Sequence, residues 1–337
     1  ASSLAVATAE EAVQLARELG RSALVLGALS REELRAAAAA RAEIVAWDLA
    51  FVELLRREAE RSGSIGVHVK LDTGLGRLGT RDAEQALAVV RAVVASPGLT
   101  LTGVMTHFAT ADSDLEFAAE QLGAFETFVA EARALATSDI TVHAANSAGI
   151  LRVPGSDFDM VRAGIALYGA DPMNHDPADH GLEPALALRS YVATVKAIAA
   201  GQSTGYGRRF IAPRDSTIAT VPIGYGDGFV RALADNCDVL IGGRRYPVRG
   251  MVSMDNITVD VGPDPVVARG DRVTLIGGDG GERVTAEELA RRAGTISYEV
   301  LCWISRRVPR LYHHDGRPDH DWRPDHDGRP DHDGRPV

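Results

Sequence analysis

The chain has 337 residues, 45% of them hydrophobic, which is enough for two domains or for one large barrel with a smaller partner. Its net charge of -10 argues against a nucleic-acid-binding surface, and no apolar run is long enough to cross a membrane. The only cysteines, Cys237 and Cys302, are too few for a disulfide framework, so we expect a reducing, cytoplasmic compartment.

Short apolar segments alternate with helix-like stretches rich in Ala, Glu, Leu and Arg through the first half of the chain. Strands are predicted at 4–7, 23–27, 43–48, 65–74, 101–109, 140–147 and 160–169. These segments are mostly apolar, as strands buried on both faces should be, and the intervening helices imply a parallel sheet. Because seven such strands are one short of a closed barrel, we predict an α/β barrel of the (β/α)8 TIM type, missing its first strand, over residues 1–175.

The pattern changes after a segment rich in Pro, Asp and His at 171–184, which we interpret as the linker. Strand-like runs separated by Gly, Asp and Pro turns then follow, with one helix predicted at 286–294. Residues 184–312 are therefore predicted to form a mostly β C-terminal domain.

A hexapeptide repeat ends the chain. It begins as HDGRPD at His314 and recurs from His320, His326 and His332, and half of the ten histidines lie at 313 or beyond. Since the repeat has too few apolar residues for a core, we expect 313–337 to be a disordered, solvated tail. Metal binding by these histidines is the alternative that we weigh less, and we expect no metal site elsewhere.

Polar residues lie at the carboxyl ends of several predicted strands of the first half, where (β/α)8 barrels place their active sites. Each has an ordinary structural explanation by itself, but four successive polar strand ends together favour a site. They are Lys70 with Asp72 and Arg77, His107, Asn146 with Ser147, and Arg162 with Gly164 and Ile165.

Eight segments resemble alanine racemase, in unbroken order over roughly residues 4–312. They are VKLDTGLGRLGT (69–80), MTHFATAD (105–112), HAANSAGIL (143–151), DMVRAGIALYG (159–169), STGYGRRF (203–210), TVPIGYGDGFVRAL (220–233), VRGMVSMDNITVDVG (248–262) and TISYEVLCWISRRVPRLY (295–312). The resemblance implies an isomerase that uses pyridoxal 5'-phosphate (PLP). It also implies a barrel with a β-rich C-terminal domain, and a homodimer in which each active site is completed by the partner subunit.

The resemblance assigns the proton chemistry to three residues. Tyr206 matches the tyrosine base that acts on L-alanine from the opposite subunit, His107 lies beneath the cofactor ring, and Arg162 faces the pyridine nitrogen. An arginine does not give up its proton, so it leaves the ring nitrogen unprotonated and the ring a weaker electron sink.

The remaining matched positions hold the cofactor phosphate and the substrate. The implied phosphate-binding residues are Ser147, Gly164, Ile165 and Tyr298. The implied substrate-binding groups are Arg77 and the backbone N–H of Met254, with Asp255 beside it.

Three further positions complete the resemblance. Lys70 matches a lysine that many members carry carbamylated, with an ordinary salt bridge to Asp72 or another acid as the alternative. Tyr225 matches a tyrosine that narrows the entrance to the site. Met251 departs from the family, where an arginine is usual, and this puts the charged entrance layer in doubt.

Lysine is almost absent, because only Lys70 and Lys196 among the 36 basic residues are lysine. The family carries PLP on a lysine that ends the first barrel strand, and no stretch like VKANAYGHG occurs here. We therefore expect an N-terminally truncated alanine racemase with little activity.

The expected reaction of the complete enzyme is the interconversion of L- and D-alanine by two bases, supplying D-alanine for peptidoglycan in a bacterial cytoplasm. A non-catalytic protein of the same fold and a broader amino-acid racemase are the alternatives.

Overall fold

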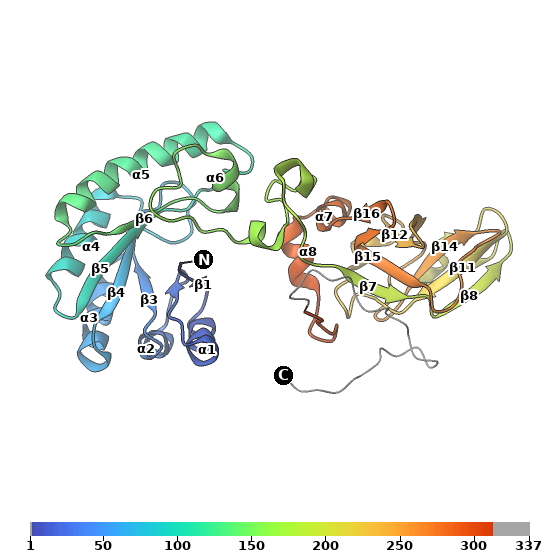
Figure 1. The fold of residues 1–337 in the computed structure, drawn as a ribbon, viewed down its shortest axis with the longest axis horizontal. Helices are drawn as coiled ribbons and strands as arrows, with labels where there is room; N and C mark the ends of the chain where they lie inside the picture. The colour runs from blue at the N-terminus through green and yellow to red at the C-terminus, as the bar shows by residue number, and fades with distance from the viewer. Residues whose placement is uncertain (1, 313–337) are drawn as a thin grey trace. The chain divides into compact units, whose positions relative to one another are not determined.

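The computed structural model describes residues 2–312 (Figure 1). The chain divides into two compact units, Ala1–Gly164 and Ile165–Val337. The hexapeptide repeat predicted to be a disordered tail lies outside the described residues.

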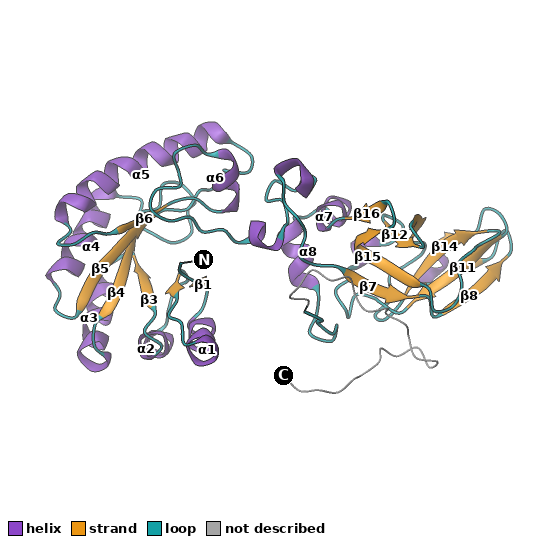
Figure 2. Cartoon of the chain, viewed as in Figure 1, coloured by secondary structure: helices purple, strands orange, loops and turns teal. Residues whose placement is uncertain are grey.

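The first unit is a parallel sheet whose strand order follows the chain, β1-β2-β3-β4-β5-β6. Helices connect successive strands and cover one face of the sheet (Figure 2). This arrangement confirms the predicted α/β fold of the barrel type. The strands are β1 (Ala5–Val6), β2 (Leu24–Val25), β3 (Glu43–Ala46), β4 (Ile65–Lys70), β5 (Leu99–Met105) and β6 (Thr141–His143). The helices are α1 (Ala9–Leu19), α2 (Arg31–Ala39), α3 (Leu49–Ser62), α4 (Ala83–Ala95), α5 (Leu115–Leu135) and α6 (Ser147–Arg152).

Local sequence signals explain where the first helices begin and end. Thr8 and Ser30 each cap a helix and accept a hydrogen bond from the backbone of a glutamate three residues on, while that glutamate accepts one from the backbone N–H of the cap. This reciprocal pair satisfies two N–H groups that the helix itself cannot. Gly20 ends α1 with a φ of 61°, a left-handed conformation that glycine adopts without strain.

The core of this unit lies on both faces of the strands. Val67 and Val69 are fully buried in β4, and the helices add large buried side chains such as Leu55 and Phe125. Because successive strand residues alternate between faces, each central strand also presents residues to the face that the helices do not cover. The catalytic candidates lie on this second face or at its carboxyl edge.

The seventh predicted strand, at 160–169, is wrong. Asp159 N–H donates to the Val142 carbonyl at 3.1 Å and Arg162 N–H to the Ala145 carbonyl at 2.9 Å, so this segment runs beside the end of β6. Two separated hydrogen bonds do not make a ladder, and the chain then turns into a 3-10 helix, η1 (Ile165–Tyr168). The apolar composition indicates buried chain, but it does not make this segment a strand.

The second unit consists mainly of β-strands, as predicted, and these strands pair in an antiparallel manner. One sheet has the order β14-β11-β8, a second has the order β13-β12-β15-β16 with β7 paired to β15, and β9 and β10 form a hairpin. Its strands are β7 (Leu188–Tyr191), β8 (Thr194–Ile198), β9 (Ser203–Thr204), β10 (Phe210–Ile211), β11 (Ser216–Val221), β12 (Asp238–Ile241), β13 (Arg244–Pro247), β14 (Ile257–Gly262), β15 (Arg272–Asp279) and β16 (Glu282–Val284). Two helices follow, α7 (Ala286–Ala293) and α8 (Ser297–Trp303).

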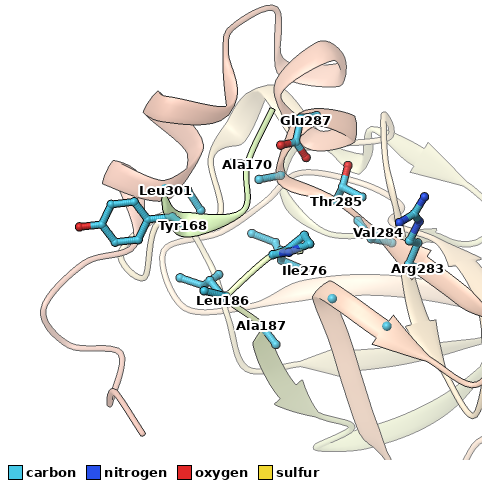
Figure 3. A pocket seen from close by; sticks show the side chains of 15 residues that line it. Tyr168, Ala170, Leu186, Ala187, Ile276, Arg283, Val284, Thr285, Glu287 and Leu301 are labelled. Carbon is cyan, nitrogen blue, oxygen red and sulfur yellow. The ribbon is translucent and has the colours of Figure 1, made fainter. Parts of the chain in front are cut away.

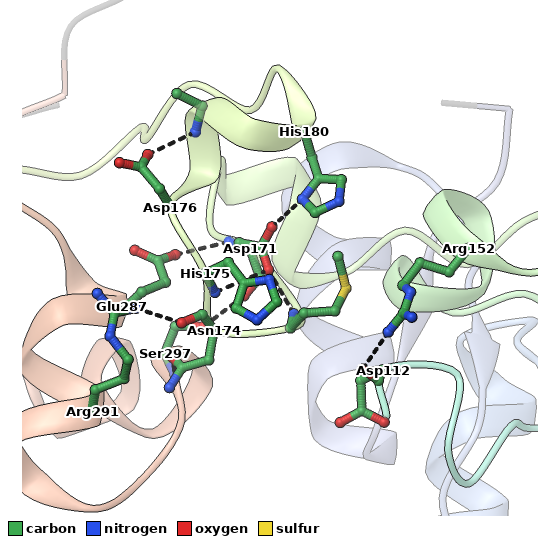
Figure 4. A network of polar contacts seen from close by, with 12 residues as sticks. Asp112, Arg152, Asp171, Asn174, His175, Asp176, His180, Glu287, Arg291 and Ser297 are labelled. Carbon is green, nitrogen blue, oxygen red and sulfur yellow. Dashed lines mark hydrogen bonds and ion pairs between the residues drawn. The ribbon is translucent and has the colours of Figure 1, made fainter. Parts of the chain in front are cut away.

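The segment interpreted as a linker is folded against α7 and α8 through the buried residue Asp171 (Figure 4). The Asp171 carboxylate accepts hydrogen bonds from Met173 N–H at 2.7 Å and pairs with His180 Nδ1 at 2.5 Å. Its backbone N–H donates to Glu287 at 2.8 Å, and its carbonyl accepts from the Ser297 hydroxyl at 3.2 Å. Polar residues of this segment therefore form hydrogen bonds within the second unit and are not only solvated.

None of the helices within residues 2–312 has the length and apolar character that a membrane crossing requires.

Candidate active site

Polar side chains lie at or just beyond the ends of three neighbouring strands, at one edge of the first sheet. Lys70 is the last residue of β4, His143 is the last residue of β6, and His107 lies two residues beyond the end of β5. The carboxyl ends of parallel strands meet at the same edge, so the parallel order of β4, β5 and β6 brings these side chains together. The structure thus places two of the predicted strand-end residues, Lys70 and His107, in one neighbourhood.

Arg162 lies at the centre of this neighbourhood. Its Nη2 lies 2.8 Å from both the Thr106 and the Ala144 carbonyl oxygens and 3.2 Å from His107 Nδ1, so its two protons are shared among three acceptors. Its Nη1 donates to His143 Nδ1 at 2.7 Å. Burial lowers the pKa of Arg162 to about 10, so the guanidinium stays charged at neutral pH. We call this set of contacts the Arg162 clamp. Within residues 2–312 the buried Arg162 Nε has no hydrogen-bond partner.

His107 is held in one neutral form. Burial, followed by nearby positive charges, lowers its pKa to about 3. Because a guanidinium only donates, His107 Nδ1 must accept from Arg162, and the ring proton must therefore lie on Nε2. The neighbouring cations are Arg162, Lys70 and Arg77.

Lys70 is a buried amine next to other cations. Its residue is only 3% exposed, and its pKa is lowered to about 8, first by burial and then by the charges of Arg77 and Arg162. The charge of Asp72 opposes this shift but does not overcome it. A larger part of the amine is therefore neutral near pH 8 than in an exposed lysine.

The salt bridge that was the alternative for Lys70 is not formed with Asp72. The Asp72 carboxylate accepts hydrogen bonds from the backbone N–H groups of Gly74 at 3.0 Å and Gly76 at 2.9 Å, and it pairs with Arg81 at 3.4 Å. Asp72 therefore shapes the turn that carries Arg77 past the end of β4.

Ser147 and Gly164 meet at the neighbouring strand end. The Gly164 N–H donates to the Ser147 hydroxyl at 3.0 Å. A Cβ built on Gly164 would have no other heavy atom within 4 Å, so open space lies beside this backbone. Ile165, the next residue, is buried and begins η1 in the second unit.

The other predicted residues belong to the second unit and are largely exposed. Tyr206 is 73% exposed, Met254 52%, Tyr225 42% and Tyr298 38%. The Tyr225 N–H donates to the Ser253 carbonyl at 3.0 Å, and the Gly226 N–H donates to the Met254 carbonyl at 2.9 Å. Tyr225 and Met254 are therefore carried by two loops that are joined by backbone hydrogen bonds.

An arginine that the sequence did not single out holds one of these loops. Arg307 Nη2 lies 2.5 Å from the Asp255 carboxylate, and its Nε lies 2.8 Å from that of Asp227. Both carboxylates raise the pKa of Arg307. Arg307 thus fixes Asp255, next to Met254, to the turn that follows Tyr225.

Another arginine lies against Met251, the position at which the chain departs from the family pattern. Arg209 Nη1 lies 3.8 Å from the Met251 sulfur, and Arg209 Nε pairs with Asp235 at 2.7 Å. A positive charge is therefore present beside Met251, although residue 251 itself is uncharged.

Three polar residues beneath Arg162 were also missed from the sequence. His143 Nε2 lies 2.8 Å from His68 Nδ1, and His68 Nε2 lies 3.3 Å from the Glu43 carboxylate. One signal existed for His68, since residues two apart on a strand share a face and His68 precedes Lys70 by two. No comparable signal joined Glu43 to them.

The second unit also contains a mainly apolar cavity of about 290 Å³ (Figure 3). Its wall includes Tyr168, Leu186, Ile276 and Leu301. Glu287, its one buried acid, already accepts the Asp171 N–H. No predicted site residue lines this cavity, and it is not part of the candidate site.

Metal ligation has no cluster to support it in the described part of the chain, where His, Cys, Asp and Glu form no group of three or more that could hold an ion.

Comparison with known proteins places both units. The family model described as "Alanine racemase, N-terminal domain" matches residues 1–172, and that described as "Alanine racemase, C-terminal domain" matches 185–312. The chain is 42% identical to an alanine racemase of Symbiobacterium thermophilum over 312 residues, covering 92% of this chain and 82% of that protein. It is also 42% identical to an alanine racemase of Treponema pallidum over 323 residues, covering 92% and 85%. An alanine racemase of Bacillus anthracis, solved with bound L-Ala-P, superimposes with a TM-score of 0.84 at 34% identity, covering 93% of this chain and 82% of that one.

Proposed function

Because the chain belongs to the alanine racemase family, an isomerase family, we propose that it carries most of the active site of an enzyme that interconverts L- and D-alanine with PLP. The observation that supports this most directly is the Arg162 clamp. Its buried Nε atom has no hydrogen-bond partner within residues 2–312 and can donate to a bound group.

The residues around that donor fit PLP. An unprotonated pyridine nitrogen is an acceptor that suits Arg162 Nε, and a guanidinium does not protonate it. Ser147 and Gly164 border open space where a phosphate group can be held, with Ile165 and Tyr298 as the proposed groups from the second unit. When bound, PLP supplies an electron sink that stabilises the charge left on alanine by loss of its α-proton.

Tyr206 is proposed to move that proton. A tyrosine hydroxyl in water has a pKa of about 10, so it needs its surroundings to favour the phenolate if it is to act as a base near neutral pH. At 73% exposed, Tyr206 has little protein around it within its own chain. We infer that the partner subunit of a homodimer provides those surroundings, and that each active site is shared between two copies.

The substrate is proposed to be oriented by its carboxylate. Arg77 supplies a positive charge, and the backbone N–H of Met254 supplies a neutral donor, while Arg307 keeps the neighbouring Asp255 in place.

Tyr225 narrows the entrance and favours a small amino acid. Arg209 beside Met251 is proposed to retain some positive charge in an entrance layer where the usual arginine is absent. We further propose that the D-alanine serves peptidoglycan synthesis in a bacterial cytoplasm.

The cofactor site can be tested with phosphopyridoxyl-alanine, a stable amine that joins the cofactor to alanine and needs no lysine for binding. We expect the 337-residue chain to bind this conjugate in calorimetry. Arg77→Met should weaken binding by about tenfold, since it removes a charged partner of the carboxylate. The matched control is Arg133→Met, in which an exposed arginine paired with Asp159 is lost and binding should be unchanged. No binding by the unmodified chain would contradict the proposed cofactor site.

Lys70 is proposed to carry a carbamate, which would turn a cation into an anion beside Arg77. Carbon dioxide reacts with a neutral amine, and the pKa of about 8 makes that form abundant as the pH rises from 7 to 9. Protein exposed to 13C-labelled bicarbonate should therefore show a carbamate carbon signal that grows over this range.

Lys70→Arg should abolish the carbamate signal, whereas Lys196→Arg should leave it intact, because Lys196 is an exposed residue of β8. A signal that survives in Lys70→Arg would refute the assignment.

A further inference from the structure

A buried line of polar side chains crosses the first unit from β3 to Arg162. Glu43 is the first residue of β3, His68 lies within β4, and His143 ends β6. His68 and His143 are 2% and 0% exposed, while the Glu43 side chain is 39% exposed. The line therefore begins at a carboxylate that water can reach and ends at the cation of the candidate cofactor site.

The protons along this line can point in only one direction. Arg162 Nη1 can only donate, so His143 Nδ1 accepts and the proton of His143 lies on Nε2. That proton faces His68 Nδ1 at 2.8 Å, so the proton of His68 lies on Nε2 and is donated to Glu43. Burial, and then the charge of Arg162, lowers the pKa of His143 to about 2, which keeps this ring neutral. The hydrogen bond from His68 lowers the pKa of Glu43, which keeps the final acceptor charged.

The sheet leaves room for these side chains. A Cβ on Gly103, which pairs with His68 across β4 and β5, would lie 2.3 Å from His68 Nδ1 and 2.6 Å from the Thr141 carbonyl. A Cβ on Gly66 would lie 3.0 Å from the Glu43 carboxylate. The register of β4 and β5 also shifts between Val67 and His68. Neither glycine has a positive φ, so space, not backbone conformation, explains glycine at both positions.

We propose that Glu43, His68 and His143 are positioning residues that act as one directional hydrogen-bond chain and hold Arg162 with its Nε aimed at the pyridine nitrogen. The carbonyls of Thr106 and Ala144 accept hydrogen bonds from Nη2 of the guanidinium, and the hydrogen-bond chain accepts one from Nη1. A rotation that moved Nε away from the pyridine nitrogen would therefore break hydrogen bonds at both Nη1 and Nη2. This inference rests on the proposed PLP site for its functional consequence. The direction of the protons follows from the contacts within the first unit and does not depend on the PLP site.

The first measurement concerns the protons and needs no cofactor. With 15N-labelled histidine in the 337-residue chain, ring-nitrogen shifts should report Nδ1 unprotonated and Nε2 protonated in both His68 and His143. A protonated Nδ1 in either ring would overturn the proposed direction, whether or not the chain binds PLP.

The second measurement separates positioning from mere structural support. His68→Leu interrupts the hydrogen-bond chain, and His143 and Glu43 each lose a hydrogen bond to residue 68. The affinity for phosphopyridoxyl-alanine should therefore fall by about tenfold. His68→Gln can accept from His143 and donate to Glu43, so it should recover most of that affinity. The Arg162 Nε–H signal should move in His68→Leu and return toward its original position in His68→Gln.

Glu43→Ala provides a second interruption at a half-buried position, for use if His68→Leu does not fold. It should weaken binding in the same direction, whereas Glu43→Gln, which keeps an acceptor, should bind within about threefold of the original chain. Glu58→Gln is the control, since Glu58 is a buried acid of this unit that takes no part in the hydrogen-bond chain and pairs with Arg61. If folded His68→Leu or Glu43→Ala binds the conjugate with unchanged affinity and its Arg162 Nε–H signal does not move, the hydrogen-bond chain does not position Arg162. Failure of the unmodified chain to bind the conjugate would instead contradict the proposed cofactor site, and the histidine shifts would still decide the proton direction.

Discussion

A protein of these 337 residues, supplied with PLP, should exchange the α-proton of alanine at least about a thousandfold more slowly than an otherwise equal chain that carries the PLP lysine of the family. The reason is the position of its two lysines. Lys196 is exposed on β8 of the second unit, and Lys70 lies among guanidinium groups at the site proposed for the carbamate. A lysine in this family provides both the covalent partner of the cofactor and a base on one face of the substrate.

The assay is deuterium exchange at the α-carbon of both alanine enantiomers in D₂O. Three chains are compared: the 337 residues as they stand, the same residues preceded by the family segment with its lysine, and the same extension with alanine in place of that lysine. The second should be fast, and the other two should be slow. Fast exchange by the 337 residues alone would mean that Lys70 or Lys196 has taken over, and Lys70→Arg and Lys196→Arg would identify which.

Mixed dimers make the same assay a test of the shared site. The chain of 337 residues keeps Tyr206, so combining it with an extended subunit that has the lysine but carries Tyr206→Phe should restore one complete site in each mixed dimer. Each parent alone should be slow. Mixed dimers that form but recover no exchange would exclude the proposed sharing, and would favour a non-catalytic protein of the same fold. Parallel measurements with serine and lysine as substrates would separate an alanine racemase from a broader one.

Replacement of Arg162 should produce the largest loss of stability in the first unit. Arg162→Met removes the donor for the Thr106 and Ala144 carbonyls and for His143, and leaves these buried acceptors without a partner. An unsatisfied buried group costs about 1 to 3 kcal/mol, so we expect the free energy of unfolding of this unit to fall by about 3 kcal/mol or more. This prediction does not depend on the cofactor.

Amide hydrogen exchange measured on peptides from β4, β5 and β6 reports this unit separately from the second one. In Arg162→Met, the protection of peptides from β4, β5 and β6 should fall. The protection of peptides from β11 and β14 should remain unchanged. Arg133→Met is the control, because its ion pair with Asp159 is exposed and such pairs contribute about 1 kcal/mol or less. Equal protection in the two variants would show that Arg162 is not the central support of these strand ends.

The fold was largely accessible from the sequence because it depends on local patterns. Short apolar strands, helices of regular spacing and cap residues such as Thr8 and Ser30 repeat along the first half, and each can be recognised within about ten residues. The segment at 160–169 shows the limit of such patterns. An apolar run shows that chain is buried, but only the neighbouring backbone determines whether a ladder forms beside it, and β6 ends too early for one.

The candidate site was partly accessible for the same reason. Strand ends can be read from a pattern, and in a parallel sheet they converge, so Lys70, His107 and Arg162 were expected together and are together. The expected salt-bridge alternative for Lys70 was wrong with respect to Asp72, because the backbone N–H groups of the following turn take that carboxylate first. The roles assigned to these residues by resemblance remain predictions.

The sequence by itself determined the family, the order of strands and helices, and the presence of only two lysines. The tertiary structure alone decided which polar groups meet inside the sheet. His68 and His143 are separated by 75 residues, and Glu43 and His68 by 25, so their contacts depend on the register of β3 to β6 and on the space left by Gly66 and Gly103. A hydrogen bond requires its donor and acceptor to lie within about 3 Å, and no local pattern in a chain carries that information between distant strands.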